Sequence, residues 1–343
     1  THQMVLSSEI PTSLKKRIVD TFGRTHDYLR ISLTDKCNFR CFYCMPDEKI
    51  NFYPTSKLMS ADELLNIAQT FVSLGVKKIR LTGGEPLIRK DAREIISRLA
   101  DLPIELAITS NGYLLDQYLD LFQDIGLNSI NISLDTLNEE KFHKITKRDY
   151  LRKVKSNIDL FIEKGFKIKV NVVVLKNVNE YEIKDFVEWT RNTNVHVRFI
   201  EFMPFNGNTW DFSKIISYKQ ILEEIDSSGF DYQRLVDSKN DTAKNYRLNG
   251  GVGTFAVISS VTDSFCGSCN RIRLTADGKI KNCLFSNSEL DLLRAYRNGL
   301  GLEELIFKSI KAKFDERGGL PTFEEIDEEK DLGKGRCMFA IGG

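Results

Sequence analysis

The sequence predicts an α/β fold, a partial (β/α)6 barrel of the TIM type that is closed by a smaller α+β C-terminal domain. Three observations predict it. Short β-branched runs alternate with helical patterns from Tyr28 to about Met203. Each strand pattern has one apolar and one polar face. Glycines stand where the helices should stop. Repeated β-then-α units imply parallel strands, and right-handed crossovers curl such strands into a barrel.

The elements follow in order along the chain. Candidate strands are residues 29–34, 76–82, 104–109, 129–134, 167–174 and 196–202, and helical stretches lie near 60–74, 91–100, 114–125, 138–163 and 179–192. Ser60 and Glu63 form a capping box at the start of the first helix. Gly75, Gly126 and Gly165 are placed to end helices.

The domain boundaries are expected near glycine and proline residues. We expect an N-terminal tail at 1–22, the barrel at 23–205, and a C-terminal domain at 206–343 that begins after a break at Pro204–Thr209 and has a helix near 217–227. Thr1-His2-Gln3 before Met4 is interpreted as a cloning remnant.

Bulk composition argues against several classes of function. The 343 residues carry a net charge of +1, so no global field attracts nucleic acid or a membrane surface. The longest apolar runs are too short to span a bilayer, and no signal-peptide pattern is visible. We therefore expect a cytoplasmic, reducing location, where clustered cysteines are more often metal ligands than disulfides.

The polar strand face predicts an anion-binding lumen. It includes six cations, Arg30, Lys78, Arg80, Lys167, Lys169 and Arg198. Buried cations need partners, so the lumen is expected to be open and to receive an anionic ligand such as a polyphosphate. The alternative is a half-exposed sheet with a solvated polar face, but helices between the strands argue against it.

Six of the seven cysteines fall into two sets of three. Cys37-x3-Cys41-x2-Cys44 follows the first strand, at the end of the barrel where active sites lie, and Cys266-x2-Cys269-x13-Cys283 lies in the C-terminal part. Three thiolates are one too few for a closed zinc site, and on a cubane cluster they leave one iron free. The pattern predicts two [4Fe–4S] clusters with open corners; a structural zinc loop is the alternative. Cys337 is expected to be an ordinary thiol.

The run Gly83-Gly84-Glu85-Pro86 follows the second strand, on the same end of the barrel. The two glycines are expected to let the backbone approach a ligand closely, and Glu85 is expected to accept a hydrogen bond from an amine. Alone this run would be an ordinary turn. Beside the cysteine motif it predicts a ligand site.

With the three-cysteine motif, Tyr43 just before Cys44 and the Gly-Gly-Glu-Pro run, the chain resembles the radical S-adenosylmethionine (SAM) superfamily. The resemblance implies a [4Fe–4S] cluster on Cys37, Cys41 and Cys44 whose open iron chelates SAM and cleaves it to a 5′-deoxyadenosyl radical. The second cysteine set, and the final Ile341-Gly342-Gly343, resemble the molybdenum cofactor biosynthesis protein A family, the GTP 3′,8-cyclases.

This second resemblance implies a reaction and a set of site residues. GTP would be cyclised between C3′ and C8 in the first step of molybdenum cofactor synthesis, with guanine held at the C-terminal cluster. Arg271 and Arg273 project from one strand face beside a cluster ligand and, with Arg30, are assigned to the reaction. The residues implied for SAM are Tyr43, Gly84, Glu85, Ser133, Met203 and Arg198, and those for GTP are Arg30, Arg80, Thr109, Lys169, Arg271 and Arg273.

Two other classes of protein share parts of this pattern. A radical SAM peptide-modifying enzyme with an auxiliary cluster usually has more C-terminal cysteines. An iron–sulfur electron carrier or regulator would need neither the Gly-Gly-Glu-Pro run nor a cationic lumen. The expected partners of the cyclase are GTP, SAM, a one-electron donor and, transiently, the next enzyme of the molybdopterin pathway. A homodimer is left open, and neither nucleic acid nor a membrane is expected.

Overall fold

The computed structural model describes residues 16–45 and 50–343. Most of the expected tail, including the Thr1-His2-Gln3 remnant, lies outside the described residues, as do residues 46–49. The described part of that segment is packed rather than extended: Ile18 and Asp20 are buried, and Val19 pairs with Thr25 in a short bridge.

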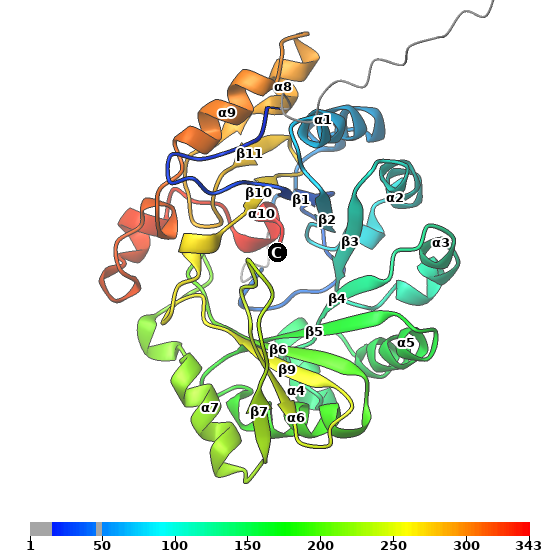
Figure 1. The fold of residues 1–343 in the computed structure, drawn as a ribbon, viewed down its shortest axis with the longest axis vertical. Helices are drawn as coiled ribbons and strands as arrows, with labels where there is room; N and C mark the ends of the chain where they lie inside the picture. The colour runs from blue at the N-terminus through cyan, green and yellow to red at the C-terminus, as the bar shows by residue number, and fades with distance from the viewer. Residues whose placement is uncertain (1–15, 46–49) are drawn as a thin grey trace, which may run out of the picture.

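One twelve-stranded sheet organises the molecule (Figure 1). Its parallel strands, in spatial order, are β10 (Arg271–Leu274), β1 (Tyr28–Ser32), β2 (Lys78–Thr82), β3 (Glu105–Ser110), β4 (Ser129–Ser133), β5 (Lys167–Val174), β6 (Val195–Glu201) and β9 (Thr254–Ile258). Antiparallel strands extend both edges: β11 (Lys279–Lys281) and β12 (Leu290–Asp291) beyond β10, and β8 (Lys244–Leu248) and β7 (Tyr232–Arg234) beyond β9. The sheet is an open curl, a partial barrel whose outermost strands are β12 and β7.

The helices of the first part cover the outside of this curl (Figure 1). They are α1 (Ala61–Ser73), α2 (Ala92–Ala100), α3 (Leu119–Asp124), α4 (Glu139–Thr146), α5 (Leu151–Glu163) and α6 (Ile183–Asn192). The predicted capping box of Ser60 and Glu63 is confirmed at α1. Gly75, Gly126 and Gly165 follow their helices with φ of 102°, 69° and 84°, a conformation that glycine adopts without strain.

The prediction of one helix over 138–163 was wrong. Lys147 adopts a left-handed conformation with φ of 58°, and its N–H donates to the carbonyl of His143 at 2.8 Å. This caps α4, and a new helix, α5, begins only at Leu151. A helical periodicity that continues across a short break conceals such a cap.

The C-terminal part shares the barrel's sheet instead of forming a separate layer. Its helices are α7 (Tyr218–Ser227), α8 (Leu292–Arg297), α9 (Glu303–Lys311) and α10 (Met338–Ile341). β9 and β10 are consecutive in the chain but lie at opposite edges of the parallel array. The connection 259–270 therefore crosses from one edge to the other, and it carries Cys266 and Cys269.

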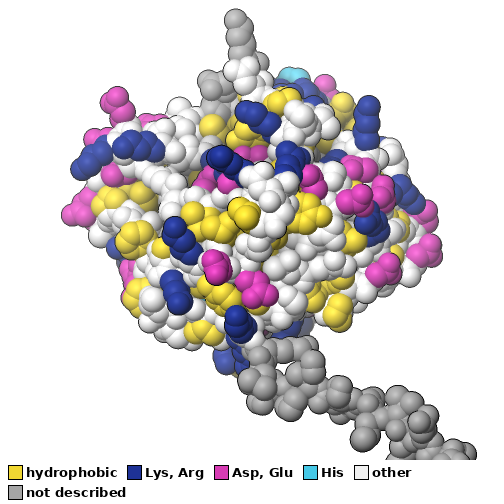
Figure 2. Space-filling model, turned by 90° about the horizontal axis from the view of Figure 1, so that it is seen from above, with side chains coloured by type: hydrophobic (Ala, Val, Ile, Leu, Met, Phe, Trp, Pro, Cys, Tyr) yellow, Lys and Arg dark blue, Asp and Glu magenta, His cyan; other side chains and the backbone are white. Residues whose placement is uncertain are grey.

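The two faces of the strands separate as predicted. The outward face is buried beneath the helices, and its side chains include Leu29, Ile31, Ile79, Leu81, Ile108, Ile130, Ile132, Ile168, Val170, Val197 and Phe199. Lys167 was predicted to face the lumen with the other cations, but it is exposed to solvent at the start of β5. On the face drawn in Figure 2, Lys and Arg are interspersed with Asp and Glu. None of the helices described has the length and apolar composition that a membrane crossing requires.

Candidate active site

Two adjacent cavities open inside the curl of the sheet. One contains the N-terminal cysteines, and the other, which is larger, is lined by basic residues. They share the lining residues Tyr43, Thr109, Ser133 and Asp135, and the C-terminal residues Met338 and Gly343. The two cavities therefore form one continuous site.

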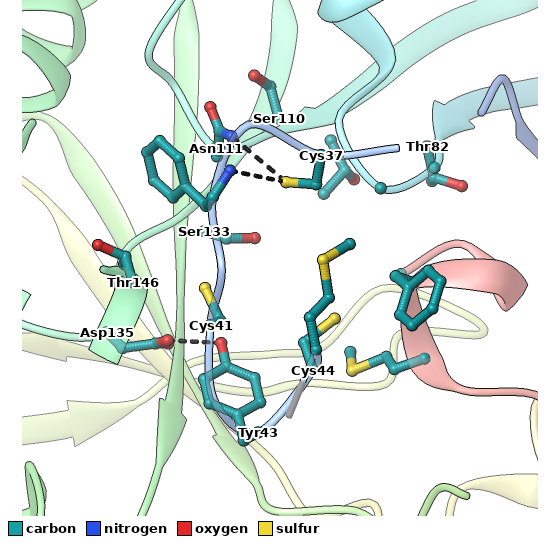
Figure 3. Close-up of a pocket in the computed structure, with 18 of the residues that line it drawn as sticks. Cys37, Cys41, Tyr43, Cys44, Thr82, Ser110, Asn111, Ser133, Asp135 and Thr146 are labelled. Atoms are coloured by element: carbon teal, nitrogen blue, oxygen red, sulfur yellow. Dashed lines mark hydrogen bonds between the residues drawn. The ribbon is translucent and has the colours of Figure 1, made fainter. Parts of the chain in front are cut away.

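The cysteine pocket is built on the loop that follows β1 (Figure 3). Cys37, Cys41 and Cys44 all line it. A turn in which the N–H of Cys44 donates to the carbonyl of Cys41 at 3.0 Å brings the last two cysteines together. The Cys37 sulfur accepts hydrogen bonds from the N–H of Phe39 at 3.4 Å and from the Asn111 amide at 3.9 Å.

Burial makes these thiols poor acids on their own. It raises the pKa of Cys37 to about 11, with the nearby charge of Glu85 adding to the effect, and it also raises the pKa of Cys41 and Cys44. A thiolate would therefore form here only beside a compensating positive charge such as a metal group supplies. Three cysteines that line one pocket, N–H donors to the Cys37 sulfur and the adjoining space fit a three-cysteine iron–sulfur cluster with a ligand at its open corner.

The double glycine lets two loops pack together. The N–H of Gly84 donates to the carbonyl of Thr34 at 2.7 Å, and the N–H of Glu85 donates to that of Lys36 at 2.8 Å. A Cβ on Gly84 would lie 2.2 Å from the Lys36 carbonyl oxygen. Gly84 also lines the pocket, but what demands glycine here is the backbone of the cysteine loop.

Glu85 lies beneath the pocket instead of lining it. It is 1% exposed, and its carboxylate accepts hydrogen bonds from the N–H groups of Leu87 (3.2 Å) and Asn111 (2.7 Å) and from the Ser110 hydroxyl (2.9 Å). Burial raises its pKa to about 7. These contacts join the loop after β2 to the end of β3, and the expected contact of Glu85 with a ligand amine stays a prediction.

The larger cavity is strongly cationic. Its basic lining residues are Arg30, Lys78, Arg80, Lys169, Arg198, Arg271 and Arg273, and its acidic ones are Asp135 and Asp241. Strand register sets the spacing, because Arg30 of β1 lies opposite both Arg273 of β10 and Arg80 of β2. Such an excess of positive charge in one cavity suits a polyanion.

Neutral polar groups hold the guanidinium groups in place. Arg80 donates through Nε to the Tyr28 hydroxyl at 2.6 Å and through Nη1 to the Ile108 carbonyl at 2.9 Å. Arg198 donates to the Asn171 side chain at 2.9 Å. With its amide oxygen turned toward the arginines, Asn131 accepts from Arg80 at 3.3 Å and from Arg198 at 2.7 Å. Ile108, Asn171 and Asn131 fix orientation without neutralising charge, and Tyr28 does so in its protonated form.

The electrostatics of the cavity favour an anion. Burial and neighbouring cations lower the pKa of Arg30 and Arg198 to about 10, of Arg273 to about 9 and of Lys169 to about 8. Burial opposes ionisation of Tyr28, but Arg30 and Arg80 bring the pKa of this residue down to about 7. Among the described residues, Arg30 Nε and Thr109 Oγ1 are buried without a hydrogen-bond partner. A bound anion would relieve both conditions.

The last residues of the chain enter this site. The carbonyl oxygen of Gly342 accepts a hydrogen bond from Arg273 at 2.7 Å, and that of Gly343 accepts one from Arg30. Gly342 has φ of 86°, and a Cβ there would lie 2.5 Å from the Thr82 hydroxyl. Only a glycine fits this position. The expected tail is thereby placed against two of the predicted substrate arginines.

The second cysteine set lies beside the cationic cavity. Among the described residues, Phe265, Asn270, Arg271 and Leu284 line the cavity, whereas the adjacent Cys266, Cys269 and Cys283 do not. Burial opposes ionisation of Cys269, but Arg271 and Lys313 lower its pKa to about 6; burial raises the pKa of Cys283. Within the described residues, no three Cys, His, Asp or Glu side chains converge as ligands of a single metal ion.

Comparison with known proteins defines the class first. Residues 31–190 match the Radical SAM superfamily, and residues 195–318 match Molybdenum Cofactor Synthesis C. A solved structure of Streptococcus suis SuiB bound to S-adenosylmethionine has the same fold, with a TM-score of 0.54 and 17% identity over 80% of this chain and 66% of that one. A partial α/β barrel with a three-cysteine loop at its mouth is, with these matches, a radical SAM enzyme.

The relatives narrow the class to one family. "GTP 3′,8-cyclase, mitochondrial" of Arabidopsis thaliana is 44% identical over 100% of this chain and 87% of its own length, and "GTP 3′,8-cyclase" of Listeria welshimeri is 41% identical over 94% and 98%. "Molybdenum cofactor biosynthesis protein 1" of Drosophila melanogaster is 48% identical over 86% of this chain, which spans about half (53%) of that protein. The chain belongs to the GTP 3′,8-cyclase family.

Sequence reasoning located most of this site but missed several of its residues. Arg30, Arg80, Thr109, Lys169, Arg198, Arg271 and Arg273 come together in the cationic cavity with Met203, while Tyr43 and Ser133 line both cavities. Tyr28 was missed although it continues the polar alternation one step before the predicted strand. Asp241, in the β7–β8 loop, and Lys313, behind Cys269, carry no periodic signal.

Proposed function

We propose that this chain converts GTP to (8S)-3′,8-cyclo-7,8-dihydroguanosine 5′-triphosphate, the first step of molybdenum cofactor biosynthesis. The observation that carries the proposal is the continuity of the two cavities, in which a three-cysteine pocket adjoins a cavity with seven Lys and Arg side chains. Hydrogen abstraction from C3′ of the ribose and closure onto C8 of guanine require both ends of the site at once.

At the cysteine end, Cys37, Cys41 and Cys44 would hold a [4Fe–4S] cluster. Such a cluster would supply the electron that cleaves bound SAM to a 5′-deoxyadenosyl radical and methionine. Tyr43, Gly84, Ser133, Met203 and Arg198 are the proposed SAM neighbours. Tyr43 is itself fixed, because its hydroxyl donates to Asp135 at 2.5 Å. Glu85 would act indirectly, by holding the loop that carries Asn111.

At the cationic end, the chain's own charges would bind the triphosphate. Arg30, Arg271 and Arg273 lie along the β1–β10 pair, and Arg80 and Lys169 lie on the strands that follow. Guanidinium groups bind phosphate oxygens in pairs and stay charged, so they fix position as well as affinity. The unpartnered Thr109 hydroxyl would donate to the substrate. The contribution of these residues is orientation of one C–H bond.

A second [4Fe–4S] cluster on Cys266, Cys269 and Cys283 is also proposed, with guanine at its open iron. Supporting this, the neighbouring residues Arg271 and Leu284 line the substrate cavity, so a group on these cysteines would border it. The remaining partners are proposals of the same kind: a one-electron donor, transient contact with the next enzyme of the pathway, and a homodimer. A cytoplasmic location also stays a proposal, and one plant relative is named as mitochondrial.

The peptide-modifying alternative rests on likeness of fold alone, since SuiB is 17% identical. The competing functions separate in one assay on anaerobically reconstituted protein. Release of 5′-deoxyadenosine should rise on adding GTP, and a cyclised nucleotide should appear with it. Release that GTP leaves unchanged would contradict the cyclase proposal and leave an unspecified radical SAM enzyme.

A further inference from the structure

Lys313 is a buried lysine beside a cluster cysteine. It follows α9 and is only 5% exposed. Its ammonium nitrogen lies 3.4 Å from the Cys269 sulfur and 3.4 Å from the Arg271 carbonyl oxygen. Among the ion pairs of the described residues, none joins Lys313 to a carboxylate, and the group able to carry negative charge to which it donates a hydrogen bond is the Cys269 sulfur.

We propose that Lys313 is a positioning residue that holds the Cys269 thiolate and sets the reduction potential of the C-terminal iron–sulfur cluster. The inference rests on the proposed second cluster. A cubane with three thiolate ligands is anionic and becomes more so when it takes up an electron. A fixed ammonium at one ligand sulfur stabilises the reduced form more than the oxidised form, and so raises the potential.

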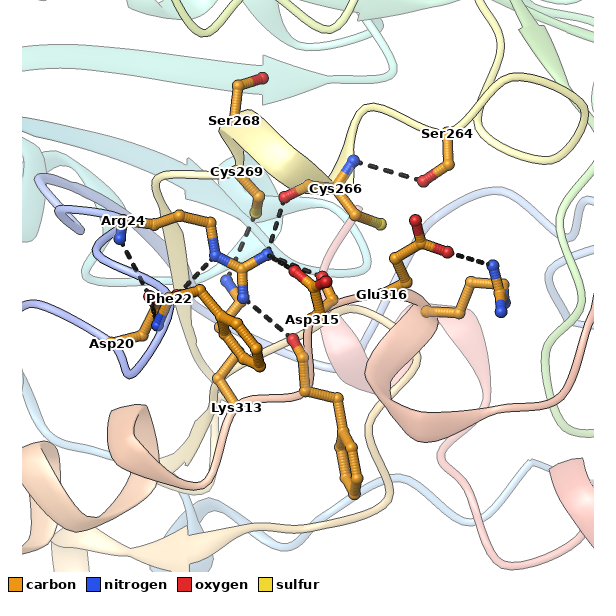
Figure 4. Close-up of polar contacts among 12 residues, drawn as sticks. Asp20, Phe22, Arg24, Ser264, Cys266, Ser268, Cys269, Lys313, Asp315 and Glu316 are labelled. Carbon is orange, nitrogen blue, oxygen red and sulfur yellow. Dashed lines mark hydrogen bonds and ion pairs between the residues drawn. The ribbon is translucent and has the colours of Figure 1, made fainter.

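A clamp around Arg24 keeps Lys313 in place (Figure 4). The Arg24 guanidinium donates to the carbonyl of Cys266 at 2.8 Å, to that of Asp315 at 2.7 Å and to that of Phe314 at 3.0 Å. One side chain thus ties the loop of the cysteines to the segment of Lys313. These bonds hold the backbone next to Lys313 and the backbone of the cysteine loop at a fixed separation.

The clamp is itself buried and fixed. Asp20 accepts from Arg24 Nε at 2.6 Å and lies 3.0 Å from the imidazole of His26. Burial holds the pKa of His26 down to about 4, and nearby Lys313 adds to this, so the ring is neutral near pH 7 and leaves Arg24 and Asp20 paired with each other. The segment just before β1 therefore contacts the loop of the C-terminal cysteines, since Arg24 and Cys266 are 242 residues apart in the chain.

The test compares three substitutions in the full-length, anaerobically reconstituted protein. Lys313→Met removes the charge at similar volume, Lys313→Arg keeps it, and Lys311→Met makes the same charge change at an exposed site two residues away. Midpoint potentials are measured by paramagnetic resonance during redox titration. The C-terminal signal is identified by its response to GTP, and the N-terminal signal, identified by its response to SAM, is the internal reference.

We expect a more negative potential for the GTP-sensitive signal in Lys313→Met only, with the SAM-sensitive signal unchanged throughout. Loss of this cluster in Lys313→Met but not in Lys313→Arg would also support the proposal. An unshifted potential in Lys313→Met, an equal shift in Lys311→Met, or loss of the cluster in both Lys313 variants would overturn it. About four irons in the wild-type protein would instead refute the second cluster itself, before any variant is made.

Discussion

Arg30 and Arg273 lie opposite each other on the parallel strands β1 and β10, and their guanidinium groups donate to the carbonyl oxygens of Gly343 and Gly342 respectively. The cationic cavity is therefore the place where the end of the chain meets β1 of the barrel and β10 of the C-terminal part. Arg30 retains a buried Nε without a partner, so the tail does not exhaust its donors.

Lys169 and Lys167 allow a test of the anion site on a single strand. Both point to the same face of β5, but Lys169 lines the cavity and Lys167 is exposed. Lys169→Gln should weaken GTP binding by about 1.5–3 kcal/mol, or roughly 10- to 150-fold, because a charge-assisted hydrogen bond is lost. Titration calorimetry measures this. Lys167→Gln is the control, and equal affinities of the two variants would contradict an anion site here.

GTP affinity should fall as pH rises through about 8. Burial, with Arg198, Arg80 and Lys78 nearby, lowers the pKa of Lys169 from 10.5 to about 8, so its charge disappears from that pH upward. Between about 8 and 10.5 the unfolded chain binds more protons than the folded one at this residue, so its contribution to folding stability improves over the same window.

The control for this pH dependence is Lys169→Arg, which stays charged. Binding is compared between the variant and the wild type at each pH from 7 to 9.5, so that the nearby Tyr28, with its pKa of about 7, contributes equally to both. The variant should keep its affinity further into alkali. If the two pH profiles are parallel, the loss of GTP affinity at high pH is due to a group other than Lys169.

The barrel strands were predictable because their signal is local. Each of the six predicted strands lies within two residues of an observed one, since β-branched alternation and terminal glycines fix type and bounds. The pairing of β10 with β1 was not predictable, because Tyr28 and Arg271 are 243 residues apart and periodicity does not reveal a distant partner.

The same limit applies to the site. Arg30 and Lys169 were assigned to the lumen from alternation alone, and both line it. Glu85 was assigned a ligand contact, but its carboxylate accepts hydrogen bonds from Leu87 of its own loop and from Ser110 and Asn111 at the end of β3, and the sequence does not place these last two donors near it. Lys167 was assigned to the lumen by its face, although it lies where the strand begins, outside the cavity.

Each cysteine set should account for half of the iron. Changing Cys37, Cys41 and Cys44 to alanine should reduce the iron content from about eight to about four per chain, and the same change at Cys266, Cys269 and Cys283 should do likewise. Cys337→Ala, the control, should keep all of it. Iron and sulfide are measured after anaerobic reconstitution. If the iron content stays at about eight per chain after either cysteine set is removed, that set does not hold a cluster.

Arg336 should hold the tail in the site. Arg336 lies six residues before Gly342. Its guanidinium donates to the Asp277 carboxylate at 2.9 and 3.0 Å and to the Glu289 carboxylate at 2.6 and 2.8 Å. Arg336→Ala leaves two largely buried carboxylates with only the longer ion pairs from Lys279 to Asp277 (3.9 Å) and from Lys281 to Glu289 (3.8 Å). Residues 338–343 should therefore exchange amide hydrogen faster and GTP binding should weaken, while iron content is kept.

Arg297→Ala is the matched control for Arg336. It removes a similar two-bond pair with Glu63, at 2.7 and 3.0 Å, on an exposed surface. Exposed pairs contribute about 0–1 kcal/mol, so little should change in either measurement. Unaltered exchange at the tail in Arg336→Ala would show that the glycine contacts hold the tail without this anchor.

Gly84→Ala should disturb the N-terminal cluster from outside its ligand set. The new Cβ would lie 2.2 Å from the Lys36 carbonyl oxygen and 2.9 Å from that of Asp35, and neither backbone atom can move away as a flexible side chain could. Relief requires the two loops to separate, which breaks the bonds from Gly84 to Thr34 and from Glu85 to Lys36. Cys37, next in the chain, would move with them. We expect a loss of about 1–3 kcal/mol of stability and roughly half of the bound iron.

Gly267→Ala tests the same change beside Cys266, where nothing lies within 4 Å of an added Cβ, and it should keep all the iron. If Gly84→Ala keeps a full N-terminal cluster, the packing of these two loops does not position its cysteines.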